Sequence, residues 1–370
     1  MIYLDNAATT FPKPNEVTDA LTAYMTSCGA SPGRGGYDSS IRSAEMLFEC
    51  QEEIARLLSI PSPERIVFTK NATEALNAAI FGTVDAGDEI IISSMEHNAV
   101  MRAAHECSRR GVYVKIAHGS PTGKIAPESI KNLITDKTKL ICLIHSSNVC
   151  GTINDIYSVQ KIATESNTLA LFDLSQSAGI IPIDASGLDM VAFSGHKGLM
   201  GPMGTGCLYI REGIDPSPLL FGGTGSYSES ARMPLIYPDR FHAGTVNAPG
   251  IAALCEGVRF VLREGVFEKE KEITSYMYDA LSDISGVTVP GERERTNAIS
   301  VICPHHDCVH IAEELNKSQV CVRAGLHCAP MAHRTIGTIQ SGTIRFSAGF
   351  FTEKPDVDFA LSALKKIIGK

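Results

Sequence analysis

The sequence predicts an α/β protein with a large domain built on a mostly parallel sheet and a small α+β domain. Short apolar runs alternate with helical patterns through the first half of the chain. Several of these runs lack polar–apolar alternation, as strands buried on both faces do. The pattern changes at the glycine-rich stretch 221–226. Alternation of strands and helices at this spacing is typical of a parallel sheet covered by helices.

The elements of the large domain are expected in the first 210 residues. Strands are expected at 65–69, 89–92, 113–116, 140–144, 169–172, 190–193 and 207–210, and helices at 71–80 and 98–110. After residue 244 we expect helices at 249–263, 307–317 and from 354, with β-rich runs at 297–302, 320–323 and 342–346. This order predicts a large domain over residues 14–248. The small domain would combine residues 249–370 with residues 1–13, and Pro12 and Pro14 break regular structure at the boundary between them.

The composition argues against several classes of protein. The 370 residues carry a formal net charge of −8, no tryptophan and no basic stripe with interleaved aromatics, so nucleic-acid binding is not expected. No run approaches roughly 18 uninterrupted apolar residues, and the N-terminus does not look like a secretory signal. We therefore expect a cytoplasmic protein that does not associate with membranes.

The eleven cysteines are an odd number without a C-x-x-C pair, which argues against a disulfide framework. A zinc site is conceivable at Cys303-Pro-His-His-Asp-Cys308, where soft ligands cluster. Because no second cluster accompanies it, incidental use of these residues is favoured and no metal is expected.

Polar residues follow the expected strands one after another. In open α/β sheets, ligands bind beyond the carboxyl ends of the strands. The polar groups are Asn71-Ala-Thr73, Met95-Glu-His-Asn98, His145-Ser-Ser-Asn148, Asp173-Leu-Ser-Gln176 and Ser194-Gly-His-Lys197. One such group alone could be a turn, but five in series predict a binding site.

The residue types in this series predict a site for pyridoxal 5′-phosphate. A lysine amine forms a Schiff base with an aldehyde when burial or a nearby cation lowers its pKa, and Lys197 lies between glycines beside His196. An aspartate such as Asp173 can keep a pyridine nitrogen protonated, which makes the ring an electron sink. Thr73 and Ser194, together with His196, could hold a phosphate.

Each residue also has a plainer interpretation. A lysine after a strand is usually a solvated charge, and an aspartate there is often a helix cap. Asn71 or Thr73 could cap the following helix, and His145 is expected to be a satisfied polar residue. The ordered set, rather than any single member, favours the cofactor site.

Six motifs occur in order along nearly the whole chain. They are Tyr3-Leu-Asp-Asn-Ala-Ala-Thr-Thr10, Asn71-Ala-Thr-Glu-Ala-Leu-Asn77, Met95-Glu-His-Asn98, Ser147-Asn148 with Gly151, Asp173-x-x-Gln176-x-x-Gly179 and Ser194-Gly-His-Lys197. Together they resemble the class V aminotransferase family. The resemblance implies the PLP-dependent fold type I, which is aspartate aminotransferase-like.

The resemblance also implies roles for individual residues. Lys197 would be the Schiff-base lysine, and His97 would be a second catalytic residue, stacked on the cofactor ring. Asp173 would contact the pyridine nitrogen, and Gln176 would contact the ring hydroxyl. The phosphate would be held by Thr73, Ser194 and His196. Asn148 and Arg345 match residues that bind the substrate carboxylate. The segment Phe241-His-Ala-Gly-Thr245 matches one through which a partner subunit donates a threonine to the phosphate, which implies a homodimer.

The segment Arg323-Ala-Gly-Leu-His-Cys-Ala329 resembles the active-site loop of group II cysteine desulfurases. This resemblance implies that Cys328 takes sulfur from L-cysteine as a persulfide, leaving L-alanine, and that a sulfur-acceptor protein removes it. Arg323 and His327 are close in sequence, and either could favour the thiolate. By number alone Cys328 would be one of eleven ordinary cysteines; its place in the loop favours the catalytic role.

The chain departs from this group at several positions. Leu326 stands where a second histidine commonly precedes His-Cys, and Tyr37 stands where many relatives have histidine. Two alternatives therefore remain open. One is a selenocysteine lyase or another lyase or epimerase of the same family; the other is a silent sulfur-carrier or regulatory homologue. The intact Asp173, His97 and Lys197 argue against the silent homologue.

Overall fold

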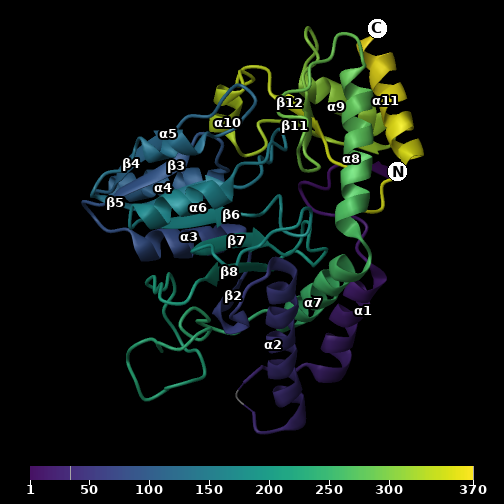
Figure 1. Cartoon of the computed structure of the whole chain (residues 1–370). Helices are drawn as coiled ribbons and strands as arrows, with labels where there is room; N and C mark the ends of the chain where they lie inside the picture. The colour runs from purple at the N-terminus through teal and green to yellow at the C-terminus, as the bar shows by residue number, and fades with distance from the viewer. Residues whose placement is uncertain (34, 370) are drawn as a thin grey trace.

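The computed structural model describes residues 1–33 and 35–369, and the largest element in this part of the chain is a seven-stranded sheet (Figure 1). The strands lie in the order β2-β8-β7-β6-β5-β3-β4. β8 runs antiparallel to both neighbours, and the other neighbouring pairs are parallel. The bounds are β2 Ile66–Thr69, β3 Glu89–Ser93, β4 Tyr113–Ala117, β5 Thr138–Ile144, β6 Leu169–Asp173, β7 Met190–Ser194 and β8 Gly206–Ile210. The predicted mostly parallel sheet is confirmed.

Helices cover both faces of this sheet, and alternate strand residues point to opposite faces. Ile90 and Ile92 join one apolar cluster with α3 and α4, whereas Ile91 joins a second cluster with α2, α6 and α7. This two-sided burial explains why the strands are apolar without alternation. The helices are α1 Asn15–Ala23, α2 Asp38–Leu58, α3 Ala72–Thr83, α4 Asn98–Arg109, α5 Pro127–Lys131, α6 Ile156–Glu165 and α7 Ala248–Arg263; a π-helix, Tyr24–Cys28, continues α1, and a 3-10 turn, Pro63–Arg65, precedes β2.

A smaller antiparallel sheet, in the order β11-β12-β9, lies on one side of the large sheet (Figure 1). Its own apolar core includes Leu4, because β1 pairs in parallel with β10 and brings the N-terminus into this unit. The elements are β1 Ile2–Tyr3, α8 Val266–Ser282, β9 Ile299–Val301, α9 Cys308–Lys317, β10 Val320–Cys321, β11 Arg323–Gly325, α10 Pro330–Thr335, β12 Thr343–Phe346 and α11 Lys354–Ile368. The predicted domain boundaries stay a prediction; α7 packs into the core against the large sheet.

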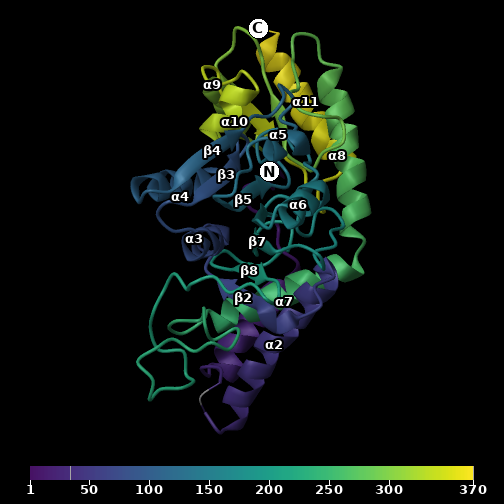
Figure 2. The same ribbon diagram turned by 60° about the vertical axis from the view of Figure 1, so that its left-hand side comes forward.

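The segment between β8 and α7 extends away from the body of the molecule in both views (Figures 1 and 2). It carries several exposed apolar side chains, among them Phe221 and Leu235. In the described part of the chain, none of the helices combines the length and the apolarity needed to cross a membrane.

The start of α3 lies directly against β8, and Gly206 permits this close approach. A Cβ atom at Gly206 would lie 2.6 Å from the backbone carbon of Asn71 and 3.0 Å from the nitrogen of Ala72. Both neighbours are backbone atoms, so they cannot move aside without shifting the helix. The N-terminus of α3 is therefore positioned by the absence of a side chain on the adjacent strand.

Gly206→Ala is expected to lower the free energy of unfolding by about 1–3 kcal/mol, because the added methyl overpacks the contact with Asn71. Chemical denaturation followed by circular dichroism measures this change. Gly187→Ala is the matched control, since a Cβ there meets no atom within 4 Å. Equal stability of the two variants would contradict the proposed close contact.

Candidate functional site

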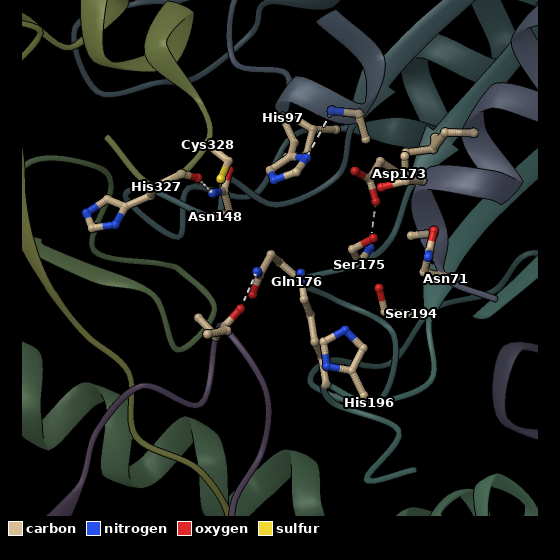
Figure 3. Close-up of a pocket in the computed structure, with 18 of the residues that line it drawn as sticks. Asn71, His97, Asn148, Asp173, Ser175, Gln176, Ser194, His196, His327 and Cys328 are labelled. Atoms are coloured by element: carbon tan, nitrogen blue, oxygen red, sulfur yellow. Dashed lines mark hydrogen bonds between the residues drawn. The ribbon is translucent and has the colours of Figure 1, made fainter. Parts of the chain in front are cut away.

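A pocket of about 240 Å³ opens at the carboxyl ends of β5, β6 and β7, where the small sheet faces the large one (Figure 3). The loops after four parallel strands, the N-terminus of α3, residues 7 and 8, and the segment 323–345 all contribute to its wall. The structure brings ten of the predicted residues together here: Thr73, His97, Asn148, Asp173, Gln176, Ser194, His196, Lys197, Cys328 and Arg345.

The N-terminus of the twelve-residue helix α3 forms one end of the pocket. Asn71 caps this helix, because its Oδ1 accepts the backbone N–H of Glu74 at 2.9 Å. Thr73 follows in the first turn and also lines the pocket. The helix N-terminus carries a partial positive charge, which favours an anion such as a phosphate.

Among the buried polar atoms of the pocket wall that have no hydrogen-bond partner, Ser175 Oγ and His196 Nδ1 lie on the side of Ser194. Burial, assisted by Lys197 and Lys13, lowers the pKa of His196 to about 4, so its ring is neutral at neutral pH. A buried polar atom without a partner is unfavourable unless a ligand satisfies it. Beside the helix N-terminus and the Ser194 side chain, these atoms fit a phosphate-bearing ligand.

Asp173 is the last residue of β6, and Lys197 follows the end of the neighbouring strand β7. Asp173 is buried at the end of its strand, and its Oδ1 accepts the backbone N–H of Ser175 at 2.9 Å. Burial lowers the pKa of Lys197 to about 8, although the charge of Asp173 opposes this shift. The amine therefore has a substantial neutral fraction near pH 8, and the neutral amine is the form that reacts with aldehydes.

His97 is fixed by the helix that follows it. Its Nδ1 accepts the backbone N–H of Ala99 at 3.1 Å, so the ring caps α4 and the neutral tautomer carries its proton on Nε2. Burial also lowers the pKa of His97, which favours this neutral form. The pocket therefore contains a flat, uncharged ring in one orientation.

A buried arginine lies at the other end of the pocket. Arg345 donates to the backbone oxygen of Asn148 at 2.9 Å and to Oδ1 of Asp5 at 2.8 Å, and its Nε has no partner. Oδ1 of Asn148 is also without a partner. Unused guanidinium donors beside an amide suit a small carboxylate.

Cys328 lies in the loop between β11 and α10. Among the eleven cysteines, all in the described part of the chain, it is the exposed one, and Figure 3 places its sulfur near His97 and Asn148. Its backbone oxygen accepts the N–H of Asn98 at 2.8 Å. A reactive thiol must be accessible, and the other cysteines are buried or half-buried.

Thr245 and His145, both considered from the sequence, lie outside the pocket. Thr245 lies in the extended segment before α7, in a separate hollow beside Phe68 and His242. His145 is buried, and its Nδ1 contacts Ser177 Oγ at 2.9 Å, so it is the satisfied polar residue that the sequence favours. Within residues 1–33 and 35–369, no group of three or more His, Cys, Asp or Glu side chains could hold a metal.

Sequence reasoning did not single out several residues of this site. Ser175 lies between Asp173 and Gln176, and this position was the one feature of the sequence that could have indicated it. Asp5 belongs to the N-terminal motif, but its contact with Arg345 joins positions 340 residues apart. Arg323 and His327, considered only as neighbours of the thiol, both line the pocket.

The sequence and fold are similar to those of known proteins. A model of the family described as Aminotransferase class-V matches residues 2–359. A protein named probable cysteine desulfurase, from Methanothermobacter thermautotrophicus, is 31% identical over 383 residues, covering 100% of this chain and 95% of the relative. A cysteine desulfurase from Salmonella dublin is 30% identical, covering 99% of this chain and 93% of that protein.

A solved structure extends the comparison. The apo structure of a cysteine desulfurase from Thermococcus onnurineus NA1 matches with a TM-score of 0.92 and 28% identity, and the match covers 100% of this chain and 94% of that one. The predicted fold class, fold type I with a large mostly parallel sheet and a small α+β unit, is confirmed by this similarity.

Lys197 in cofactor-free protein is expected to be acetylated with a pH midpoint near 8, because burial lowers its pKa to about 8. An unperturbed lysine would react with a midpoint of about 10.4. Peptide mass spectrometry after brief treatment with acetic anhydride over a pH series measures the midpoint. Asp173→Asn should move it lower, because Asp173 raises the pKa of the amine. A wild-type midpoint above pH 10 would contradict the burial effect.

Proposed function

Because the chain belongs to the class-V aminotransferase family, we propose that it is a pyridoxal-phosphate-dependent cysteine desulfurase that takes sulfur onto Cys328. The observation that carries this proposal is the exposed Cys328 in one pocket with Lys197, Asp173 and His97. The family is pyridoxal-phosphate-dependent, and relatives covering the whole chain are named cysteine desulfurases.

The residues of the pocket fit this cofactor. The unpartnered Ser175 Oγ and His196 Nδ1, together with Thr73 and Ser194, would hold the phosphate. Asp173 would hold the proton of the pyridine nitrogen, and Gln176 would contact the ring hydroxyl. The His97 ring would cover one face, and the Lys197 amine would hold the aldehyde carbon. When bound, the cofactor supplies an electron sink for bonds broken at the substrate α-carbon.

The protein's own groups would place the substrate and move its protons. Arg345 and Asn148 would bind the carboxylate of L-cysteine, which fixes the amino acid with its side chain toward Cys328. The Lys197 amine, with a pKa of about 8, can take or return a proton at the α-carbon near neutral pH.

The sulfur transfer balances without another reactant. The Cys328 thiolate attacks the substrate sulfur, so an S–S bond forms while the bond from that sulfur to the β-carbon breaks. The two sulfurs together lose two electrons, and the β-carbon gains them and takes a proton. The products are L-alanine and a persulfide on Cys328. A thiol of an acceptor protein would then remove the outer sulfur.

A selenocysteine lyase is the second candidate, since the same pocket would bind L-selenocysteine. Cys328 is what favours the desulfurase, because only attack on a thiol sulfur requires it. A lyase that eliminates selenium would not depend on this thiol.

Incubation with L-cysteine is expected to give L-alanine and an adduct of about 32 Da on Cys328, the mass of one sulfur atom. Cys328→Ala should form neither product at a measurable rate but should keep the absorption band of the bound cofactor at about 420 nm. Lys197→Ala should lack that band. Amino-acid analysis, intact-protein mass spectrometry and absorption spectra measure these effects. Undiminished alanine release by Cys328→Ala would show that the nucleophile is wrongly assigned.

We further propose that the protein acts as a homodimer in which Thr245 contacts the cofactor phosphate of the partner subunit. Thr245 lies outside the pocket of its own chain, in the extended segment between β8 and α7. Phe221 and Leu235 of that segment are about three-quarters exposed, at 75% and 77%. Exposed apolar side chains gathered on one projecting segment favour a protein–protein contact.

Replacing both apolar residues with Phe221→Glu and Leu235→Glu is expected to convert the dimer to monomer, because two charges would be buried in the contact. Sedimentation velocity measures the mass of each form. Phe359→Glu is the matched control, since Phe359 is exposed on α11, away from this segment. A double variant that stays dimeric would exclude this segment from the interface.

A further inference from the structure

The loop that carries Cys328 has an unfavourable backbone. His327 and Cys328 have φ angles of 47° and 56°, so two consecutive residues other than glycine are in the left-handed region. Such residues are rare there and need support from their surroundings. The turn directs the His327 ring into the interior and leaves Cys328 exposed in the pocket.

Three contacts with other segments of the chain hold this turn in place. The side-chain amide of Asn148 donates to the backbone oxygen of His327 at 2.7 Å. The backbone N–H of Asn98 donates to the oxygen of Cys328 at 2.8 Å. The His327 ring contacts the Thr343 hydroxyl at 2.9 Å through its Nε2. Of the three residues that contact the turn, Asn148 also lines the pocket, whereas Asn98 and Thr343 do not.

Asn148 also connects this turn to the buried arginine. Its backbone oxygen accepts from Arg345, and its side chain is buried beside the cofactor pocket. A carbonyl oxygen can only accept, so the atom facing His327 must be Nδ2, which leaves a second N–H and the unpartnered Oδ1. One asparagine can therefore hold the sulfur-accepting loop and a substrate carboxylate at the same time.

We propose that Asn148 is a positioning residue for Cys328: its amide holds the backbone of His327 in the conformation that presents the thiol to the substrate. This inference rests on the proposed desulfurase function and adds to the carboxylate-binding role of Asn148. The hydrogen bond between Arg345 and Asn148 connects carboxylate binding with loop positioning. Arg345 would hold the substrate carboxylate, and Asn148, which Arg345 contacts, holds the loop that carries the thiol.

Hydrogen exchange in substrate-free protein tests the anchor without relying on catalysis. Asn148→Ala should speed exchange of the Ala329 and Asn98 amides about tenfold, because the Ala329 N–H bonds to the oxygen of Leu326 across the turn and the Asn98 N–H bonds to the oxygen of Cys328. Thr343→Val, which removes the contact to the His327 ring outside the pocket, should act in the same direction. Asn247→Ala is the matched control, since the Asn247 amide donates to the backbone oxygen of Gly204 at 3.1 Å and Asn247 does not line the pocket that holds Cys328.

Substrate comparison tests the consequence for sulfur transfer. Release of alanine from L-cysteine requires the thiol, whereas release of alanine and sulfite from cysteine sulfinate does not. Asn148→Ala is expected to lower kcat for cysteine about tenfold more than kcat for cysteine sulfinate, and Thr343→Val should lower kcat for cysteine without raising its KM. Arg345→Ala should weaken the binding of cysteine and of cysteine sulfinate equally.

Equal losses on the two substrates together with unchanged exchange in Asn148→Ala would overturn the positioning role and leave the desulfurase proposal intact. Wild-type protein that forms no alanine from cysteine would instead overturn the desulfurase proposal. The exchange experiment would still decide whether Asn148 anchors the loop, so the two failures are distinguishable.

Discussion

The placement of the buried guanidinium of Arg345 determines how the site is assembled. A cation with 2% of its side chain exposed needs a counter-charge and hydrogen bonds, because burial removes its hydration. Asp5 supplies the charge from the N-terminal segment, and the backbone of Asn148 supplies an acceptor from the loop after β5. The cation itself belongs to the small sheet. One buried charge thus ties both ends of the chain to the carboxyl edge of the large sheet.

The N-terminal segment reinforces this assembly from a second direction. Thr9, Thr10 and Lys13 all donate to the backbone oxygen of His196, directly before Lys197. Burial lowers the pKa of Lys13 to about 7. Because a neutral amine still has N–H groups, Lys13 can donate to the His196 oxygen above pH 7 as well. The same principle governs the pocket, where burial lowers the pKa of His97, His196 and Lys197. The site therefore offers nitrogen groups that are neutral or easily neutralised, as Schiff-base chemistry requires, around one arginine that can balance a carboxylate.

The sequence was sufficient for the features that depend on local pattern. Apolar runs without alternation identified strands buried on two faces, and polar residues after those strands identified the pocket, because parallel strands place their carboxyl ends at one edge. It was insufficient where distant segments meet. Nothing in the spacing indicates that Asp5 faces Arg345, or that Asn148 reaches His327 across 179 residues. The helix-capping role of His97 was also not apparent, since histidine is not among the usual capping residues.

The two positions at which the chain departs from the related group, Leu326 and Tyr37, lie outside the pocket. Leu326 is partly exposed and Tyr37 is exposed, and neither lines the pocket that holds Cys328 and Lys197. His327, which keeps the identity expected before the cysteine, has its ring in the interior and contacts Thr343. What the turn requires is a side chain anchored inside at residue 327 and a small thiol outside at residue 328. Residue 326 precedes the two left-handed positions, and its backbone oxygen accepts the N–H of Ala329 at 2.9 Å, so it takes part in the turn through its backbone.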